Sequence, residues 1–344
     1  MKKIKVAIIG MGVVGTKRKF FLSNNKKYLV KYISDNRFKK DFKKNSINYY
    51  KDYKKIPFKN IDVVFVTLPN FLAPKVTIYF LEKNIHVFCE KPPGRNVQDV
   101  KDVLKVFKKN NKLKLKYGFN HRYHKSVVFT KKIIDSKKLG DLVNIRAIYG
   151  KSKILNFSSN NWRSDRKFSG GGILLDQGIH MLDLLKYFNN DLIFHEYKSF
   201  ISNKFWGYNV EDNAFAIMRS KNGVICSIHS TATQWQHKFN MEITFSNGTI
   251  ILEGILSGTK TYGKETLKIF PGAKPYLFKG KTAKTKKFYF AKDTSWADEI
   301  DEFAEVIMKN KKVMYGNIYD SLAVMMMIDK IYKNDKRIKN VSNK

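Results

Sequence analysis

The stretch KIKVAIIGMGVVG, residues 3–15, decides the fold class of this chain. Its first part, residues 3–9, is a short apolar run, as in a parallel strand that is buried on both faces. Three glycines follow at the point where a helix can begin. Gly10 would permit a tight turn, Gly12 would leave room for a pyrophosphate, and Gly15 would let the helix pack closely on the strand. The stretch therefore predicts a dinucleotide-binding loop.

An acidic residue supports this prediction. Asp35 lies twenty residues after Gly15, at the end of a second strand-like run over residues 29–34. A carboxylate at that position is expected to bind the ribose hydroxyls of NAD and to repel the additional phosphate of NADP. Ser34 and Arg37 could accommodate that phosphate, so NADP stays open as an alternative to NAD. The alternative for the whole motif is a tight turn followed by a surface aspartate.

The first part of the chain alternates strand-like and helix-like segments. Further strands are expected over residues 61–67, 86–88 and 113–117, and helices over residues 13–22, 76–81 and 97–107. Strands that are separated by helices predict a parallel, doubly wound sheet of the α/β class. We expect this nucleotide-binding domain to span residues 1–122.

The sequence pattern changes after Arg122. Asn222-Gly223 and Asn247-Gly248 each lie between two strand-like runs, and Asn-Gly is a strong signal for a β-hairpin. Two hairpins predict a second α/β domain, residues 123–344, with a largely antiparallel sheet. One face of such a sheet needs a cover, which another subunit could supply. Helices are expected over residues 124–136, 296–308 and 318–332.

The composition excludes several classes of protein. The 344 residues include 66 basic and 29 acidic side chains, a formal charge of +37, yet 43% are hydrophobic and 14% aromatic. The chain is therefore too apolar to be disordered, and it contains no uncharged apolar run long enough to span a membrane. Only nine of the basic residues are arginine and the lysines are dispersed, which argues against nucleic-acid binding. Two cysteines, Cys89 and Cys226, fit a reducing cytoplasm, and no metal site is expected.

Lys91 is the first candidate for chemistry. It follows the expected strand over residues 86–88, within Glu90-Lys91-Pro92. Ligands of parallel sheets bind beyond the carboxyl ends of the strands, so Lys91 would face the same crevice as the glycine loop. An ammonium group there can hold a substrate hydroxyl and stabilise a developing alkoxide. A charge pair at a strand end, followed by a proline stop, is an equally good interpretation.

Asp176 and His180 are the second candidates. They lie four residues apart in SGGGILLDQGIHMLDLLKYF, residues 169–188, which in a helix places them on one face, with Asp183 further along it. The glycines at 170–172 would let the backbone come close to a ligand. Histidine can exchange a proton near neutral pH, and Asp176 could orient it or hold a hydroxyl. The alternative is a helix with an incidental polar stripe.

Together these pieces resemble the Gfo/Idh/MocA oxidoreductases, the family of glucose–fructose oxidoreductase and inositol dehydrogenase. The residues that carry the resemblance are GMGVVG at 10–15, TLPN at 67–70, EKP at 90–92, GFNHR at 118–122, GGGILLDQGIH at 170–180 and EDN at 211–213. They occur in this order along nearly the whole chain. The resemblance implies a nucleotide-binding domain followed by an α/β domain whose large open sheet commonly forms the oligomer interface.

The resemblance also implies roles for individual residues. Lys91, Asp176 and His180 would form the catalytic set. The residues expected to contact the cofactor are Gly10, Gly12, Val13, Val14, Gly15, Asp35, Arg37, Thr67, Pro69, Asn70, Glu90, Lys91 and Asn120. The residues expected to contact the substrate are Arg122, Trp162, Arg163, Asp176 and His180.

The function that follows is hydride transfer between a secondary alcohol of a sugar-like substrate and NAD. Basic side chains, among them Arg163 and Arg166, favour an acidic or nucleotide-linked sugar, as in enzymes of surface polysaccharides. A cytoplasmic homodimer or homotetramer joined through the second domain's sheet is expected, with no nucleic-acid or membrane partner. Two alternatives are an NAD-dependent glycoside hydrolase, which the same family contains, and a non-catalytic protein that senses nucleotides or binds nucleic acid.

Overall fold

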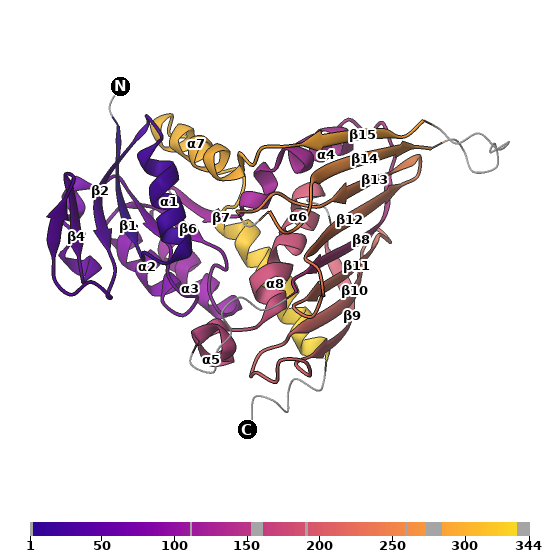
Figure 1. Cartoon of the computed structure of the whole chain (residues 1–344), viewed down its shortest axis with the longest axis horizontal. Helices are drawn as coiled ribbons and strands as arrows, with labels where there is room; N and C mark the ends of the chain where they lie inside the picture. The colour runs from indigo at the N-terminus through magenta and orange to yellow at the C-terminus, as the bar shows by residue number, and fades with distance from the viewer. Residues whose placement is uncertain are drawn as a thin grey trace. The chain divides into compact units, whose positions relative to one another are not determined.

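The computed structural model describes residues 3–110, 112–152, 161–189, 192–258, 260–272 and 284–335. The chain divides into two compact units, and Figure 1 labels most of their helices and strands. Unit 1 comprises Met1–Asn120, Phe168–Gly170 and Trp296–Ala323. Unit 2 comprises His121–Lys167, Gly171–Ser295 and Val324–Lys344. Each unit therefore combines segments that lie far apart in the sequence.

Unit 1 contains a seven-stranded sheet. In spatial order its strands are β3 (Phe42–Lys44), β4 (Ile47–Tyr50), β2 (Tyr28–Ser34), β1 (Ile4–Ile9), β5 (Val63–Val66), β6 (His86–Glu90) and β7 (Leu115–Gly118). Every neighbouring pair is parallel except β3 and β4. The predicted doubly wound parallel sheet is therefore confirmed, with an unpredicted antiparallel hairpin at one edge.

The helices of unit 1 cover this sheet. They are α1 (Val13–Ser23), α2 (Ala73–Glu82), α3 (Val97–Phe107) and α7 (Ser295–Met308), with the 3₁₀ turns η1 (Tyr53–Lys55) and η2 (Phe58–Asn60). Helix α7 comes from the far end of the sequence, and its Phe303 packs on the stacked rings of Phe65 and Phe88. Full burial of such a ring stabilises a fold by about 2–3 kcal/mol.

The strand register brings the expected cofactor residues to one edge of the sheet. Ile9 of β1 lies opposite both Ser34 of β2 and Val66 of β5, and Val66 lies opposite Cys89 of β6. The residues that follow these strand ends therefore lie at the same carboxyl edge. In parallel α/β sheets this is the edge at which ligands bind.

Unit 2 contains an eight-stranded sheet. In spatial order its strands are β15 (Lys286–Phe290), β14 (Glu265–Pro271), β13 (Gly248–Glu253), β12 (Lys238–Phe245), β8 (Leu142–Gly150), β11 (Ile225–Thr231), β10 (Asn213–Ser220) and β9 (Phe194–Ser202). Only β8 and β11 pair in parallel. The mainly antiparallel sheet is confirmed, and both Asn-Gly pairs lie at the turns of antiparallel hairpins, β10–β11 and β12–β13. Strands β9, β14 and β15 were not predicted.

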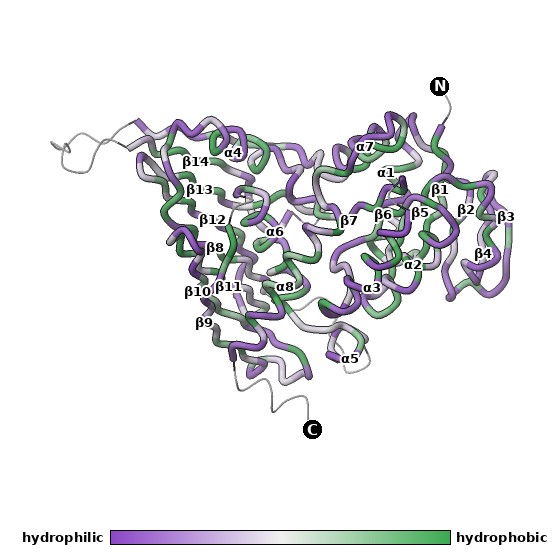
Figure 2. The backbone as a smooth tube through the Cα atoms, turned by 180° about the vertical axis from the view of Figure 1, so that it is seen from behind, coloured by the Kyte–Doolittle hydropathy of each residue, from purple (hydrophilic) through white to green (hydrophobic). Residues whose placement is uncertain are grey.

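Several helical segments belong wholly or partly to unit 2, and some of them cover one face of this second sheet. They are η3 (Asn120–Tyr123), α4 (Lys125–Asp135), η4 (Trp162–Ser164), α5 (Arg166–Ser169), the π-helical turn η5 (Leu174–Gly178), α6 (Ile179–Phe188) and α8 (Ile318–Asn334), some of which cross between units. Helix α4 contacts β13, β14 and β15, α6 contacts β8, and η5 contacts β11. The strands alternate buried and more exposed residues, and hydrophobic positions along them are green in Figure 2. The other face of this sheet carries exposed hydrophobic side chains, which include Phe200, Phe215 and Ile217.

Candidate functional site

The glycine loop of unit 1 has the geometry expected of a phosphate-binding turn. Gly10 has a φ of +97°, and a Cβ atom there would lie 2.7 Å from the Thr67 carbonyl oxygen. A Cβ atom on Gly15 would lie 2.0 Å from the Gly10 carbonyl oxygen, so that helix α1 needs glycine to pack on the turn. At Gly12, which precedes the first turn of α1, a Cβ atom would meet nothing within 4 Å. This open space at a helix N-terminus fits a pyrophosphate group.

Two further predicted cofactor residues hold backbone in place. The Thr67 hydroxyl donates to the carbonyl oxygens of Gly10 at 2.6 Å and Ile9 at 3.0 Å. The Asn70 side-chain amide donates to the Ser169 carbonyl oxygen at 2.7 Å. Pro69 begins the turn into α2, and its carbonyl oxygen accepts from Ala73 N–H. Thr67 and Asn70 thus fix the loops around the expected cofactor position, and their contact with the cofactor itself stays a prediction.

Asp35 and Arg37 form a pair beside the glycine loop. The Asp35 carboxylate accepts hydrogen bonds from Met11 N–H at 2.6 Å, from Arg37 N–H at 2.9 Å and from the Arg37 guanidinium at 2.7 and 2.8 Å. Burial raises the pKa of Asp35, but these hydrogen bonds outweigh it and bring that pKa to about 2. The carboxylate is therefore ionised at neutral pH, and it also ties the glycine loop to the end of β2.

Lys91 follows the last residue of a buried strand. Strand β6 extends to Glu90, two residues beyond the predicted end, and the Glu90 carboxylate contacts Arg18 at 2.5 Å. Lys91 is half-buried, and its peptide bond to Pro92 is cis. Asn120, at the end of unit 1, is buried in η3. Glu90 therefore has a partner within the protein, while Lys91 occupies the carboxyl edge where the cofactor is expected.

In unit 2, Asp176 and His180 lie on a π-helical turn and on the helix that continues it. The segment is helical through both residues, but it begins with the wider π-helical turn η5 at residues 174–178 instead of a regular α-helical turn. Such turns are uncommon and occur frequently at functional sites. The difference arises from tertiary contacts at the start of the turn, which the residue spacing does not show.

A group of polar side chains surrounds these two residues. The His180 ring stacks on the His121 ring with centroids 3.7 Å apart, and the His121 Nε2 lies 3.2 Å from the Tyr149 hydroxyl. The Lys151 ammonium lies 3.6 Å from Asp176, and only 7% of the Lys151 side chain is exposed. His121, Tyr149 and Lys151 were not singled out from the sequence. A signal existed for Tyr149, because it lies at the end of the alternating run that became β8, and Lys151 follows that strand directly.

Glu211 explains why the segment before Asp176 adopts its conformation. Its buried carboxylate accepts from Gly172 N–H at 2.8 Å, from Leu174 N–H at 3.0 Å and from the Tyr332 hydroxyl at 2.7 Å. A carboxylate at a helix N-terminus satisfies N–H groups that have no partner within the helix. Glu211 thereby fixes the turn that carries Asp176.

The glycines at 170–172 make close contacts with protein groups, and this corrects the expectation that they approach a ligand. A Cβ atom on Gly170 would lie 2.2 Å from the Arg95 carbonyl oxygen. On Gly171 it would lie 2.0 Å from the Tyr332 hydroxyl, and on Gly172 it would lie 2.0 Å from the Glu211 carbonyl oxygen. The small residues are required for packing within the protein.

Arg122 is buried and pairs with Asp183. Its guanidinium donates to the two Asp183 oxygens at 2.9 and 2.6 Å, the two-pronged geometry that is strongest for this pair. Trp162 and Arg163 are half-buried in η4, with the guanidinium 4.3 Å from the indole centroid. Substrate contacts of these three residues stay predictions.

Arg166 lines a pocket of about 400 Å³ in unit 2. Its walls combine aromatic rings with amide and hydroxyl groups, from Phe200, Phe215, Ser202, Asn203, Asn209 and Asn213. The predicted site residues thus fall into two groups by unit: Lys91 and the glycine loop belong to unit 1, and Asp176 and His180 belong to unit 2. Within the described residues, no helix could cross a membrane and no group of side chains could hold a metal ion.

Comparison with known proteins identifies the family. Residues 4–119 match the model described as "Oxidoreductase family, NAD-binding Rossmann fold", and residues 127–251 match the "GFO/IDH/MocA C-terminal domain". These two models describe the two domains of one class of proteins and together cover most of the chain. The protein belongs to the Gfo/Idh/MocA family of oxidoreductases, as its motifs predict, and its first domain is the NAD-binding Rossmann fold of that family.

Individual relatives are distant. Glucose-6-phosphate 3-dehydrogenase of Bacillus subtilis (strain 168) is 28% identical over 200 residues, 55% of this chain and 55% of that enzyme. Inositol 2-dehydrogenase of Salmonella typhimurium is 33% identical over 144 residues, 40% of this chain and 43% of that enzyme. The matched region thus spans about half the length of these relatives. A structure of levoglucosan dehydrogenase in complex with NADH and levoglucosan matches 98% of each chain with a TM-score of 0.81 and 19% identity, which shows a common fold.

Proposed function

We propose that the protein transfers a hydride between a secondary alcohol of a sugar and a nicotinamide cofactor. The open space at Gly12 carries this proposal, because it lies at the N-terminus of α1 and beside an ionised Asp35. A pyrophosphate and an adenosine ribose are the groups that this combination suits. The names of the distant relatives, which are dehydrogenases of sugars and inositol, support the substrate class.

The proposed mechanism assigns the chemistry to Lys91, Asp176 and His180. A bound nicotinamide would supply the acceptor for the hydride that leaves the alcohol carbon. His180 takes the hydroxyl proton as general base, and Lys91 holds the same oxygen and stabilises its developing negative charge. Asp176 positions the sugar through a second hydroxyl. The alcohol thus loses one hydride and one proton and becomes a carbonyl group.

Three neighbouring groups would keep His180 and Asp176 in place. The stacked His121 ring fixes the plane of the His180 imidazole, and Lys151 fixes the Asp176 carboxylate. The Arg122–Asp183 pair anchors α6, the helix that carries His180. We therefore propose that Arg122 acts through helix α6. Displacement of a catalytic group by about 1 Å can reduce a rate about a hundredfold, so these contacts bear on turnover.

The substrate that we propose is an acidic or phosphorylated sugar, with a nucleotide-linked sugar of surface polysaccharides as its more specific form. Arg163 and Arg166 lie in the same short segment of unit 2 and supply positive charge. The net charge of +37 would draw an anionic substrate toward the protein.

For the cofactor we propose NAD over NADP. The Asp35 carboxylate, with its pKa at about 2, carries a full negative charge that repels a 2′-phosphate. Arg37 partly offsets that charge, because its guanidinium lies 2.7 Å from Asp35. Titration with both nucleotides tests this choice, and tighter binding of NADP would reverse it.

We also propose that the protein is a homodimer or homotetramer joined through the exposed face of the unit 2 sheet. Phe200 and Phe215 lie opposite each other on β9 and β10, and Ile217 and Ile225 continue the apolar surface. Large exposed apolar patches commonly mark interfaces. Charged substitutions at Phe215 and Ile217 should therefore lower the sedimentation coefficient. The two free buried cysteines, Cys89 and Cys226, suit a reducing cytoplasm.

Turnover of a panel of neutral, acidic and nucleotide-linked sugars, followed by NADH absorbance, tests the proposed reaction. Lys91→Ala and His180→Ala should each lower kcat by roughly 10²–10⁴-fold with NADH affinity unchanged. Lys105→Ala and His195→Ala are matched controls, because both side chains are exposed on the surface. Net NADH formation separates a dehydrogenase from a glycoside hydrolase that returns NAD unchanged. Near-normal kcat in either site variant would refute the assignment.

A further inference from the structure

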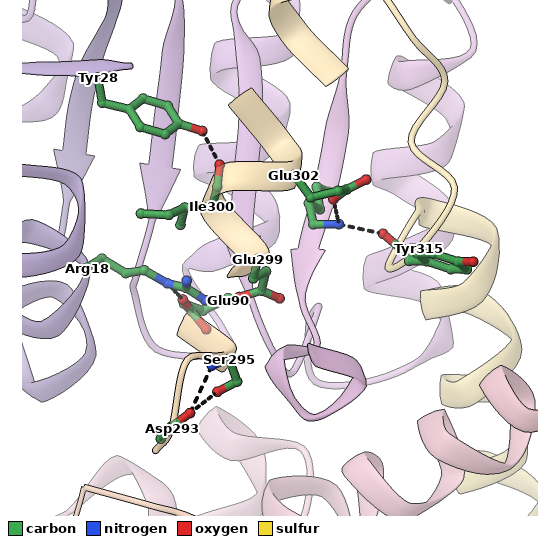
Figure 3. A network of polar contacts seen from close by, with 10 residues as sticks. Arg18, Tyr28, Glu90, Asp293, Ser295, Glu299, Ile300, Glu302 and Tyr315 are labelled. Atoms are coloured by element: carbon green, nitrogen blue, oxygen red, sulfur yellow. Dashed lines mark hydrogen bonds and ion pairs between the residues drawn. The ribbon is translucent and has the colours of Figure 1, made fainter. Parts of the chain in front are cut away.

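Arg18 is a fully buried charged side chain of unit 1 that has two acidic partners. Its relative exposure is 0%, and its guanidinium contacts Glu90 at 2.5 Å and Glu299 at 2.6 Å (Figure 3). The guanidinium also lies over the rings of Phe88 and Trp296, at 4.4 and 4.3 Å from their centroids. A buried ion cluster adds little to stability compared with apolar packing, so its presence calls for another role.

The three charged residues come from three different elements of unit 1. Arg18 lies in α1, the helix that begins at the glycine loop. Glu90 is the last residue of β6 and directly precedes Lys91. Glu299 lies in α7. The network therefore connects the phosphate-binding helix to the backbone that carries Lys91.

Gly118 makes space for this network. A Cβ atom at Gly118 would lie 2.6 Å from a Glu90 carboxylate oxygen and 3.2 Å from the Arg18 guanidinium. No left-handed backbone conformation requires glycine at this position. The glycine of the GFNHR motif is therefore explained by the carboxylate that lies against it.

We infer that Arg18 and Glu299 are positioning residues, which hold Glu90 so that Lys91 is fixed relative to the glycine loop. This inference rests on the proposed role of Lys91. Arg18 donates to Glu90 through Nε and to Glu299 through Nη2, so Glu299 orients the guanidinium that orients Glu90. The Lys91 backbone follows the Glu90 backbone directly. Loss of the contact between Arg18 and Glu299 would make Glu90 less well fixed. The Lys91 ammonium, which holds the substrate oxygen, would then be less well fixed too.

The protonation state of Glu299 also affects this network. One guanidinium faces two carboxylates, and the charged groups around Glu299 are Arg18 from α1, Glu90 from β6 and Lys116 from β7. Burial raises the pKa of Glu299 to about 7, although Arg18 opposes this effect. Near neutral pH, Glu299 therefore changes between an ion-pair partner and a neutral partner of Arg18. The positioning of Lys91 should change with it.

Glu299→Gln tests the inference, with two other contacts of the same helix as controls. Lys116 contacts Glu302 at 2.6 Å. The Tyr28 hydroxyl donates to the Ile300 carbonyl oxygen at 2.7 Å (Figure 3). Glu302→Gln and Tyr28→Phe therefore weaken the attachment of α7 without removing a partner of Arg18. Glu299→Gln should lower kcat about tenfold or more, with NADH affinity unchanged, whereas the two controls should stay within about twofold.

The pH dependence of kcat separates positioning from simple loss of stability. Glu299→Gln should flatten the component of the kcat profile near pH 7, because glutamine does not titrate. Glu302→Gln should leave that profile unchanged. Gly118→Ala, which displaces Glu90 without changing any charge, should also lower kcat. If all of these variants lower kcat in proportion to their loss of thermal stability, the network has only a structural role and the inference fails.

A second measurement does not depend on turnover. Labelling of lysines with an amine-reactive ester, followed by mass spectrometry of the digest, reports the exposure of Lys91 in the full chain. Lys91 should react at least about threefold faster in Glu299→Gln than in the natural chain, while Lys105 reacts equally in both. Unchanged labelling of Lys91 would overturn the inference. If labelling changes as expected but no sugar is turned over by the natural chain, the proposed function fails and the positioning network stands.

Discussion

The two glycine-rich segments of the chain, residues 10–15 and residues 170–172, differ in what they approach. At Gly12 a Cβ atom would meet nothing within 4 Å, whereas at each glycine of the second segment it would lie 2.2 Å or less from a protein atom. A carboxylate holds the backbone in both regions. Asp35 accepts Met11 N–H beside the first segment, and Glu211 accepts Gly172 N–H in the second. One segment therefore leaves space for a ligand, and the other packs against the protein.

This difference shows what a run of glycines indicates. Glycine identifies a backbone that another group approaches closely, but the sequence does not say whether that group is a ligand or a neighbouring chain segment. In the second segment the approaching groups include Arg95, Glu211 and Tyr332, which are distant in sequence. Substitutions should therefore affect ligand affinity in the first segment and stability in the second.

The largest effect is expected from Gly172→Ala. The added methyl group would lie 2.0 Å from the Glu211 carbonyl oxygen, a backbone atom that cannot move without disturbing the start of η5. We expect a loss of about 3 kcal/mol in the free energy of unfolding, which lowers Tm by roughly 6–12 °C. Thermal unfolding measures this, with Gly12→Ala as the control that retains the natural Tm. A natural Tm in Gly172→Ala would contradict the packing role.

Glu211→Gln should have the next largest effect. Two backbone N–H groups and the Tyr332 hydroxyl donate to this carboxylate, and a glutamine offers only one acceptor oxygen in their place. The expected loss is about 2 kcal/mol in the free energy of unfolding, measured by urea titration. Asp35→Asn, at the other carboxylate, should cost about half as much. A larger loss of stability in Asp35→Asn than in Glu211→Gln would mean that residues 10–15 depend more on their carboxylate than residues 170–172 do.

Gly12→Ala should weaken nucleotide binding with little effect on folding. Its methyl group would occupy a position with no neighbouring protein atom within 4 Å. We assign this space to the pyrophosphate. The dissociation constant for NAD should rise about tenfold, or about 1.4 kcal/mol, by calorimetric titration. Gly258→Ala is the control, since its Cβ direction in unit 2 is also open. Equal NAD affinity in Gly12→Ala and the natural chain would place the phosphates elsewhere.

The smallest effect concerns acid pH. Hydrogen bonds from Arg37 and Met11 outweigh burial and lower the pKa of Asp35 from 3.8 to about 2. The stabilisation by ionised Asp35 is thus fully present above pH 3.8 and is lost as the pH falls through about 2. Because 65% of the Arg37 side chain is exposed, solvent screening reduces the contribution to about 1 kcal/mol. Urea unfolding of the natural chain and Asp35→Asn should therefore converge as the pH falls from 6 to 2; a constant difference would contradict this.

Much of the fold could be predicted because its signals are local. The apolar run before Gly10 predicted β1, and the Asn-Gly pairs predicted the hairpins β10–β11 and β12–β13. The hairpin β3–β4 escaped prediction because its turn residues, Asn45 and Ser46, adopt positive φ angles without the glycine that usually indicates such a turn. Likewise, no local pattern shows that α7 completes the core of unit 1, since that depends on contacts with β5 and β6.

The candidate site could be predicted only in part, for the same reason. Asp176 and His180 are recognisable from their spacing and from the family motif. Lys151, directly after β8, and His121, in η3, come beside them only through tertiary contacts, and the π-helical turn depends on Glu211 from a distant loop. Arg18 was not expected at all, because its partners Glu90 and Glu299 are 72 and 281 residues away.

The central claim is that Lys91, Asp176 and His180 act on one sugar hydroxyl beside the nicotinamide. A crystal structure of the chain with NADH and a sugar that it turns over tests this most directly. The account predicts Lys91 Nζ and a His180 ring nitrogen within about 2.6–3.2 Å of the same hydroxyl oxygen, with the pyrophosphate next to Gly12. Separation of either group from that oxygen by more than about 6 Å, beyond the reach of one bridging water, would contradict it.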